Sequence, residues 1–193
     1  MINQFFYPDQ VATSQMMTDL AVDLAAKGNE VSVLTSRSAY LSNESRLARF
    51  QEYRGVKIYR TFSTKFGKGK TIGRVTDYLS FYFSVFLKAF FLKKHDVVIT
   101  LSSPPLIALV GVFLKYLRGY RFFYWVQDVY PEVAVRLGFL KEQSFVTRVS
   151  KQISRFILRR VDHVVAIGES MKKLLMLKGV EENRLSVIHN WSD

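Results

Sequence analysis

The sequence predicts an α/β fold with a doubly wound, mainly parallel β-sheet flanked by helices. Short apolar runs alternate with longer segments of helical periodicity along the whole chain, which is the pattern of such sheets. The 193 residues are enough for one sizeable domain, and 49% of them are hydrophobic. Four prolines, ten glycines and no cysteine exclude a collagen-like protein and a disulfide framework. We therefore predict a single domain over residues 1–193.

The first half of the chain begins with an apolar, aromatic run. Residues 2–7 form this run and stop at Pro8, as a short buried strand would. A helix is predicted over residues 13–28, because apolar residues recur at helical spacing and Gly28 suits a helix end. The remaining elements predicted here are strands at residues 31–35 and 56–60, a glycine- and lysine-rich loop at 62–74, and a long aromatic helix at about 75–94.

The second half continues the alternation. Strands are predicted at residues 97–101, 121–126, 163–167 and 185–188. Helices are predicted from Pro104 to Gly119, over residues 144–160 and over residues 169–178. Ligands of such sheets bind at the carboxyl ends of the strands, so the residues that follow each strand are the first candidates for a site.

The positive charge is concentrated in one stretch. The formal net charge is +12, and residues 37–74 contain ten bases but only two acids. This excess indicates a polyanionic partner: a membrane surface, a nucleic acid or a phosphorylated substrate. The sequence has no helix-turn-helix spacing, RNP-like strand or zinc module, so no nucleic acid is expected. An apolar run follows Met1 without a basic region or cleavage site, so a secretory signal is not expected.

Familiar catalytic and nucleotide motifs are missing. Residues 67–71 are similar to the end of a phosphate-binding loop, but Thr64 stands where its first glycine belongs. The same segment fails as a dinucleotide fingerprint, because Ile72 replaces the third glycine. The three histidines are scattered without metal-ligand spacing, and no serine lies in a Gly-x-Ser-x-Gly turn. We therefore expect no metal.

Two carboxylates after the predicted strand at 121–126 are the first candidates for chemistry. Asp128 and Glu132 could accept hydrogen bonds from sugar hydroxyls or assist proton transfer. They could equally be a helix cap and a first-turn acid. Spacing alone leaves both interpretations open.

Five ordered segments carry a resemblance to a known family. They are residues 6–9 leading into the helix at 13–28, Ser102-Ser103-Pro104-Pro105, the Gln127-to-Glu132 segment, residues 167–171 and residues 187–193. Together they resemble the N-terminal half of a retaining glycosyltransferase of the GT4 type with the GT-B fold, in the branch active in bacterial polysaccharide assembly. The resemblance covers essentially the whole chain.

The resemblance implies half of an enzyme. It implies a Rossmann-like N-terminal domain that holds a saccharide or lipid-linked acceptor. A second domain would hold a UDP- or GDP-sugar through a Glu-x7-Glu element and is absent from this chain. Such enzymes need no metal, since side-chain cations and a helix dipole stabilise the leaving diphosphate. We expect the 193 residues alone to be inactive.

The resemblance also implies roles for individual residues. The residues expected to bind substrate are Asp9, Thr13, Ser102, Ser103 and Glu132. Gln127 stands where many members have histidine; it can orient a hydroxyl but cannot act as a base, so acceptor positioning is its expected role. Asp128 is expected to give polar assistance, and Asn190 marks the link to the second domain. A glycine pair common in the family is replaced by residues 11–13.

The sequences of two predicted helices indicate that the protein binds peripherally to the inner face of the cytoplasmic membrane. Residues 77–92 are too short and polar to span it, and we expect their aromatics to be partly buried. The helix at 144–160 carries five bases and no acid. The bases expected at an anionic surface are Lys65, Lys68, Lys70, Arg74, Lys93, Lys94, Arg148, Lys151 and Arg155.

Two alternatives remain open at this point. The chain could be a non-catalytic basic module that binds an anionic membrane or RNA, since basic and aromatic residues lie side by side in the sequence. It could also be half of a sugar-nucleotide epimerase with a similar fold.

Overall fold

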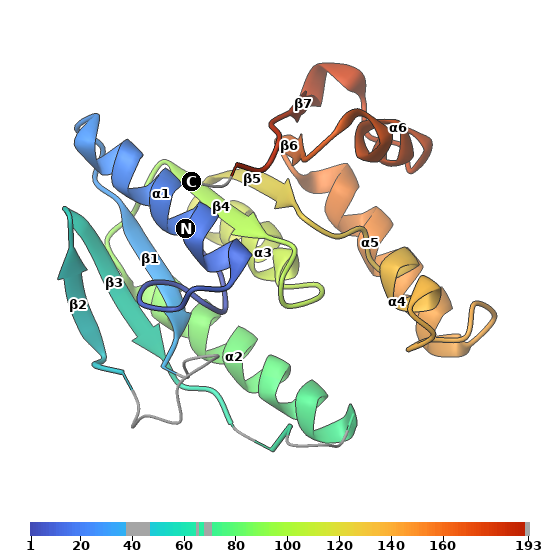
Figure 1. Cartoon of the computed structure of the whole chain (residues 1–193), viewed down its shortest axis with the longest axis horizontal. Coiled ribbons are helices and arrows are strands. Elements are labelled where there is room, and N and C mark those ends of the chain that lie inside the picture. Colours follow the sequence, from blue (N-terminus) through green and yellow to red (C-terminus); the bar gives the residue numbers. More distant parts are fainter. Residues whose placement is uncertain (38–46, 65, 68–70, 192–193) are drawn as a thin grey trace. The chain divides into compact units, whose positions relative to one another are not determined.

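The computed structural model describes residues 1–37, 47–64, 66–67 and 71–191, without the side chains of residues 71 and 72 (Figure 1). Strands and helices alternate along the chain, and the predicted α/β class with a mainly parallel sheet is confirmed. The chain divides into two compact units, Met1–Lys94 and His95–Asp193. Each unit has its own strands and helices, and the single domain stays a prediction.

The first unit is built on a three-stranded sheet in the order β1-β3-β2. Its strands are β1 (Ser32–Ser36), β2 (Phe50–Tyr53) and β3 (Val56–Thr61), and its helices are α1 (Ala12–Ala26) and α2 (Thr71–Phe91). Strands β1 and β3 are parallel, whereas β2 pairs antiparallel with β3. Helix α2 packs on β1 and β3 through Phe81 and Val85, which are fully buried.

The prediction of a strand over residues 2–7 is wrong beyond its first residue. Only Ile2 forms a bridge, parallel to Leu34. Beyond Ile2 the segment is not a regular strand, and the side-chain Nδ2 of Asn3 donates to the carbonyl of Phe5 at 2.8 Å, which fixes a local bend. The carbonyl of Gln4 still accepts from the backbone N–H of Ser36 at 3.0 Å, so the segment runs beside β1.

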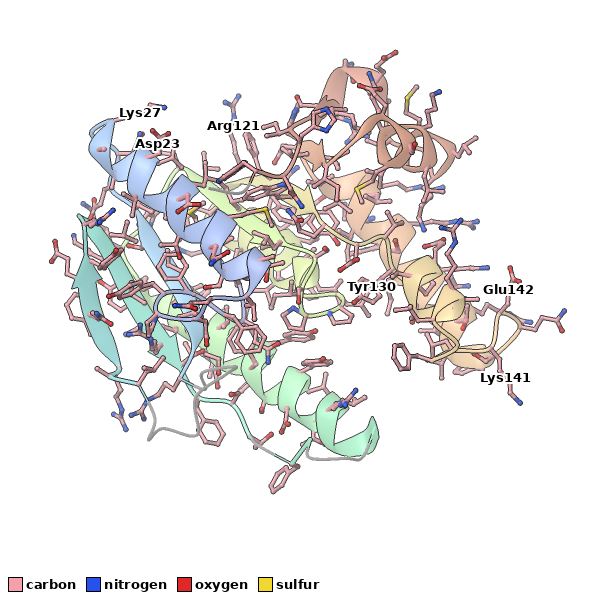
Figure 2. All side chains as sticks on the ribbon, viewed as in Figure 1. Asp23, Lys27, Arg121, Tyr130, Lys141 and Glu142 are labelled. Carbon is pink, nitrogen blue, oxygen red and sulfur yellow. The ribbon has the colours of Figure 1, made fainter. Side chains whose placement is uncertain are left out.

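Helix α1 ends close to the predicted residue. Asp23 and Lys27 lie one turn apart near its end and form an exposed ion pair of 2.7 Å (Figure 2). Gly28 follows with φ of 85°, the left-handed backbone that favours glycine after a helix.

Helix α2 begins earlier than predicted, at Thr71, and ends at Phe91. Asp77 in its second turn explains the arrangement of the preceding loop. Its carboxylate accepts from the Thr64 hydroxyl at 2.6 Å and from the backbone N–H groups of Phe66 and Gly67 at 2.9 and 2.8 Å. This part of the loop is therefore held against the helix.

The second unit contains a four-stranded parallel sheet in the order β4-β5-β6-β7. Its strands are β4 (Val97–Leu101), β5 (Arg121–Val126), β6 (His163–Ala166) and β7 (Leu185–Val187). Its helices are α3 (Ala108–Arg118), α4 (Glu132–Arg136), α5 (Phe145–Arg160) and α6 (Glu169–Leu177), with a 3-10 turn at Glu182–Arg184. Parallel order places the carboxyl ends of all four strands at one edge.

Helix α3 starts four residues later than predicted. Leu106 has φ of 65°, which is outside the right-handed helical region, so a regular helix begins only at Ala108. Gly111 of this helix lies directly on the buried ring of Phe122 in β5. Gly119, with φ of 69°, ends the helix as predicted.

Among the described helices, none combines the length and apolarity needed to cross a membrane.

Candidate functional site

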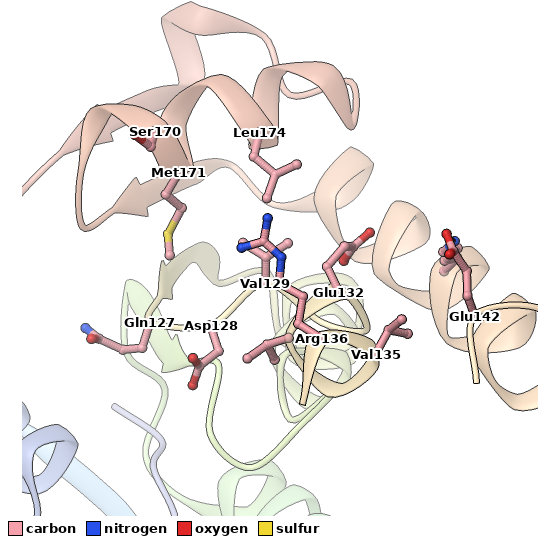
Figure 3. Close-up of a pocket in the computed structure, with 12 residues that line it drawn as sticks. Gln127, Asp128, Val129, Glu132, Val135, Arg136, Glu142, Ser170, Met171 and Leu174 are labelled. Carbon is pink, nitrogen blue, oxygen red and sulfur yellow. The ribbon is translucent and has the colours of Figure 1, made fainter. Parts of the chain in front are cut away.

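A cavity of about 630 Å³ opens in the second unit beside the carboxyl end of β5 (Figure 3). Its walls come from the loop after β5, from α4 and the loop that follows it, and from α5 and α6. The residues that line it are Gln127, Asp128, Val129, Glu132, Val133, Val135, Arg136, Glu142, Lys151, Ser170, Met171 and Leu174. Three predicted site residues, Gln127, Asp128 and Glu132, thus lie in one cavity.

Ser102 holds the loop that carries two of these residues. It directly follows β4, is fully buried, and its hydroxyl accepts from the backbone N–H groups of Gln127 at 3.0 Å and Asp128 at 2.9 Å. These two bonds fix the backbone at the cavity wall. Ser102 therefore has a positioning role, and Ser103 beside it is half-buried and does not line the cavity.

Gln127 is buried, and one of the two polar atoms of its side-chain amide forms a hydrogen bond. Its Oε1 accepts from the Nδ2 of Asn190 at 2.9 Å. Its Nε2 is buried and has no hydrogen-bond partner within the described part of the chain. Asn190 thereby sets the orientation of the amide, and its Nε2 donor is not used by the described residues.

Asp128 lies at the cavity wall and is half-buried. Burial raises the pKa of its carboxyl group above the ordinary value. A carboxylate with a raised pKa is a better proton acceptor than an exposed one, which suits a group that assists a hydroxyl.

Glu132 is engaged in an ion pair. It occupies the first turn of α4, and its Oε1 lies 2.6 Å from the Nζ of Lys178, whose side chain is only 11% exposed. Its Oε2 is buried and accepts no hydrogen bond from the described residues. The first-turn interpretation is therefore right, and the ion pair also joins α4 to the end of α6.

Arg136, Ser170 and Met171 were not among the predicted site residues. The side chains of Arg136, from α4, and Met171, from α6, extend into the space between the two helices (Figure 3). Nothing in the sequence indicated Arg136 as a site residue, because the five residues of α4 are too few to show a helical pattern. Ser170 follows β6 and is one of the polar residues at strand ends that the sequence marks as candidates, although it was not chosen as a site residue.

Asp9 and Thr13 belong to the first unit and are described there by themselves. The carbonyl of Asp9 accepts from the Ser14 hydroxyl at 2.9 Å, which ties the preceding loop to the first turn of α1. Arg60 supports the same loop from β3, donating from Nη2 to the carbonyl of Tyr7 at 2.6 Å. Burial lowers the pKa of Arg60, while the nearby charge of Asp9 acts in the opposite direction.

The basic residues expected at a membrane have varied surroundings. Lys93 forms an ion pair of 2.8 Å with Glu30, and Lys151 lies 3.8 Å from Glu142 at the α4–α5 loop (Figure 2). The residues with exposed side chains include Arg74, Lys94, Arg148 and Arg155. The residues that lie outside the described part are Lys65, Lys68 and Lys70.

Within the described ranges, no three histidine, aspartate or glutamate side chains come together as metal ligands would. The cavity instead offers an amide donor, a carboxylate and a guanidinium, which are groups that bind hydroxyls and phosphates.

Comparison with known proteins identifies the family. Residues 13–193 match the family described as Glycosyltransferase Family 4. The chain belongs to this family. It is 32% identical over 100 residues to WbjE of Pseudomonas aeruginosa, named as a probable glycosyltransferase, and the match covers 52% of this chain and 25% of WbjE.

Solved structures show the same fold at low identity. Sucrose-phosphate synthase from Thermosynechococcus elongatus has a TM-score of 0.68 and 13% identity, over 97% of this chain and 47% of its own. HepE from Anabaena, solved with UDP and glucose, has a TM-score of 0.60 and 12% identity, over 100% of this chain and 44% of its own. Both of these structures are GT-B glycosyltransferases. The present chain spans less than half the length of either one.

Proposed function

We propose that this chain is the acceptor-binding half of a retaining glycosyltransferase of bacterial polysaccharide biosynthesis. The enzyme would transfer a sugar from a nucleotide-sugar to a lipid-linked or polysaccharide acceptor. The observation that carries the proposal is the cavity at the carboxyl end of β5, in a chain of Glycosyltransferase Family 4. Gln127 and Asp128 bring an amide and a carboxylate to its wall, groups that form hydrogen bonds with sugar hydroxyls.

The proposed reaction assigns a role to each group. Gln127, oriented by Asn190, positions the acceptor hydroxyl, and Asp128 accepts a hydrogen bond from it. The acceptor oxygen bonds to the anomeric carbon on the face from which the diphosphate departs. The carbon–phosphate-oxygen bond breaks, and the acceptor proton passes to the departing phosphate oxygen. No residue of this chain needs to be a strong base, which is compatible with glutamine at position 127.

The donor in this proposal is a UDP- or GDP-sugar bound mainly by a second domain outside this chain. The structure of HepE with UDP and glucose supports a nucleotide-sugar donor by likeness of fold. We propose that no metal takes part and that cationic side chains stabilise the leaving diphosphate. Substrate contacts in the first unit are proposed for Asp9 and Thr13, and Asn190 is the proposed link to the second domain.

We also propose that the protein lies on the inner face of the cytoplasmic membrane. Helix α2 supports this, because it has two unlike faces. Phe81, Val85 and Ala89 are buried on the sheet of the first unit. The opposite face exposes large apolar side chains four residues apart: Val75, Leu79, Phe83, Leu87 and Phe91. A membrane interface would cover such a stripe.

Saturation-transfer NMR on the 193-residue chain tests the acceptor-site proposal. The ligands would be octyl glycosides of glucose, galactose, mannose and N-acetylglucosamine, and separately UDP-glucose and GDP-mannose. We expect saturation transfer to at least one glycoside, loss of that signal in Gln127→Ala, and no sugar transfer by the chain alone. Gln152→Ala, an exposed glutamine on α5, is the matched control and should keep the signal.

Three results would count against this proposal. They are glycoside binding that Gln127→Ala and Gln152→Ala leave equally intact, binding of nucleotide-sugars without binding of glycosides, and sustained sugar transfer by the 193 residues.

A further inference from the structure

A second cavity, of about 370 Å³, lies in the same unit between α5 and the end of α6. Its lining residues are Glu132, Lys151, Arg155, Arg159, Leu177, Lys178 and Gly179. Four are bases and one is an acid, and the volume is within the usual range of a ligand site. Glu132 and Lys151 also line the first cavity, so the two spaces are neighbours.

Three of these bases form a row on one helix. Lys151, Arg155 and Arg159 follow one another at intervals of four residues, so they occupy the same face of α5. Like charges at this spacing destabilise a helix unless an anion lies among them. Helix α5 itself contains no acid in its 16 residues.

The described residues provide little compensating charge. Within this part of the chain, neither Arg155 nor Arg159 forms an ion pair, and Lys151 has only Glu142 at 3.8 Å. The one acid in the cavity, Glu132, is already matched by Lys178 at 2.6 Å. The row of three bases therefore presents uncompensated positive charge to the cavity.

We propose that this cavity binds a phosphate or diphosphate group. Two guanidinium groups one turn apart can each give two parallel N–H bonds to phosphate oxygens, and Lys151 adds a third positive charge. The Glu132–Lys178 pair holds the opposite wall by joining α4 to the end of α6. The group could belong to a phospholipid headgroup or to a soluble phosphorylated saccharide, since both present the same chemistry.

This proposal is independent of sugar transfer and of Gln127. If it holds together with the proposed function, the phosphate of an acceptor would lie beside its saccharide, because the cavities share two lining residues. If the chain fails to bind glycosides, the phosphate-site proposal still stands. If it fails to bind phosphate, the acceptor-site proposal still stands.

Isothermal titration of the 193-residue chain with inorganic pyrophosphate at low ionic strength tests the site. We expect Arg155→Gln/Arg159→Gln to weaken binding at least about tenfold, which is about 1.4 kcal/mol. The control Lys141→Gln/Lys173→Gln removes the same charge from exposed positions outside this cavity and should change the affinity less than about twofold. Circular dichroism would verify that both variants fold.

Two further titrations distinguish the sources of the phosphate. One uses vesicles of phosphatidylglycerol against phosphatidylcholine, and the other uses glucose 1-phosphate. Selective loss of vesicle binding in the arginine variant identifies a headgroup, and selective loss of glucose 1-phosphate binding identifies a saccharide phosphate. The proposal is overturned if the wild-type chain does not bind pyrophosphate, or if the arginine and control variants lose affinity equally.

Discussion

At the scale of single residues, the site depends on polar side chains that fix the backbone and the side chains of the cavity wall. Ser102 is fully buried and cannot contact an acceptor, yet two backbone N–H groups of the cavity wall depend on its hydroxyl. Asn190, 63 residues along the chain from Gln127, fixes the orientation of that amide. The residues proposed to meet the acceptor are therefore preorganised by polar partners from the segments that follow β4 and β7.

The burial of Asp128 predicts a pH-dependent change in stability. Because its pKa is raised in the folded state, its protonated form is favoured by folding. The contribution of Asp128 to stability is then full below the ordinary value of about 3.8 and declines as the pH rises through the folded value. We expect Asp128→Asn to raise Tm at pH 7 and to leave it nearly unchanged at pH 3. Thermal unfolding followed by circular dichroism measures both.

Asp96→Asn, at an exposed position before β4, is the control for this prediction and should give no gain at either pH. A lower Tm for Asp128→Asn at pH 7 would mean that the carboxylate is stabilised by the fold, contrary to its raised pKa.

At the scale of elements, segments with buried apolar residues could be predicted, and segments without a fully buried position could not. The predicted bounds of β4 and β5 match the structure, because each is a continuous apolar run between helices. Strand β2 was not predicted, since its four residues Phe50–Tyr53 alternate in burial without a fully buried position. The same limit hid α4 and with it Arg136.

The packing of α3 on β5 predicts that Gly111→Ala destabilises the protein. An added Cβ would lie 2.4 Å from the ring of Phe122, which is fully buried. We expect overpacking to cost about 1–3 kcal/mol, which outweighs the gain of about 1 kcal/mol that alanine gives a helix. Urea unfolding measures the difference, and Gly111→Ala/Phe122→Leu should recover part of it. An increase in stability on Gly111→Ala alone would show that the contact is not tight.

At the scale of the whole molecule, the net charge indicates the class of partner but not which basic residues would contact it. The excess of ten bases over two acids in residues 37–74 indicates a polyanionic partner. Yet Arg60 in this stretch is buried under the loop before α1, and Lys57 is paired with Glu30 at 2.9 Å. Which bases remain available depends on contacts between distant segments, and composition does not contain them. The residues that follow strand ends were easier to locate, since Gln127 and Asp128 follow β5 and line the cavity.

The exposed stripe of α2 leads to a prediction about membrane binding of the whole chain. Flotation with phosphatidylglycerol vesicles should persist in part at high salt, because apolar burial is not screened whereas charge attraction is. We expect Leu79→Ser/Phe83→Ser to weaken vesicle binding at least about tenfold, since each buried apolar side chain contributes about 1.5–3 kcal/mol. Phe113→Ser/Leu117→Ser changes two exposed apolar residues at the same spacing on α3 and should float like the wild-type chain. Equal flotation of both variants would assign the stripe to another partner, and loss of all binding at high salt would leave charge as the sole attraction.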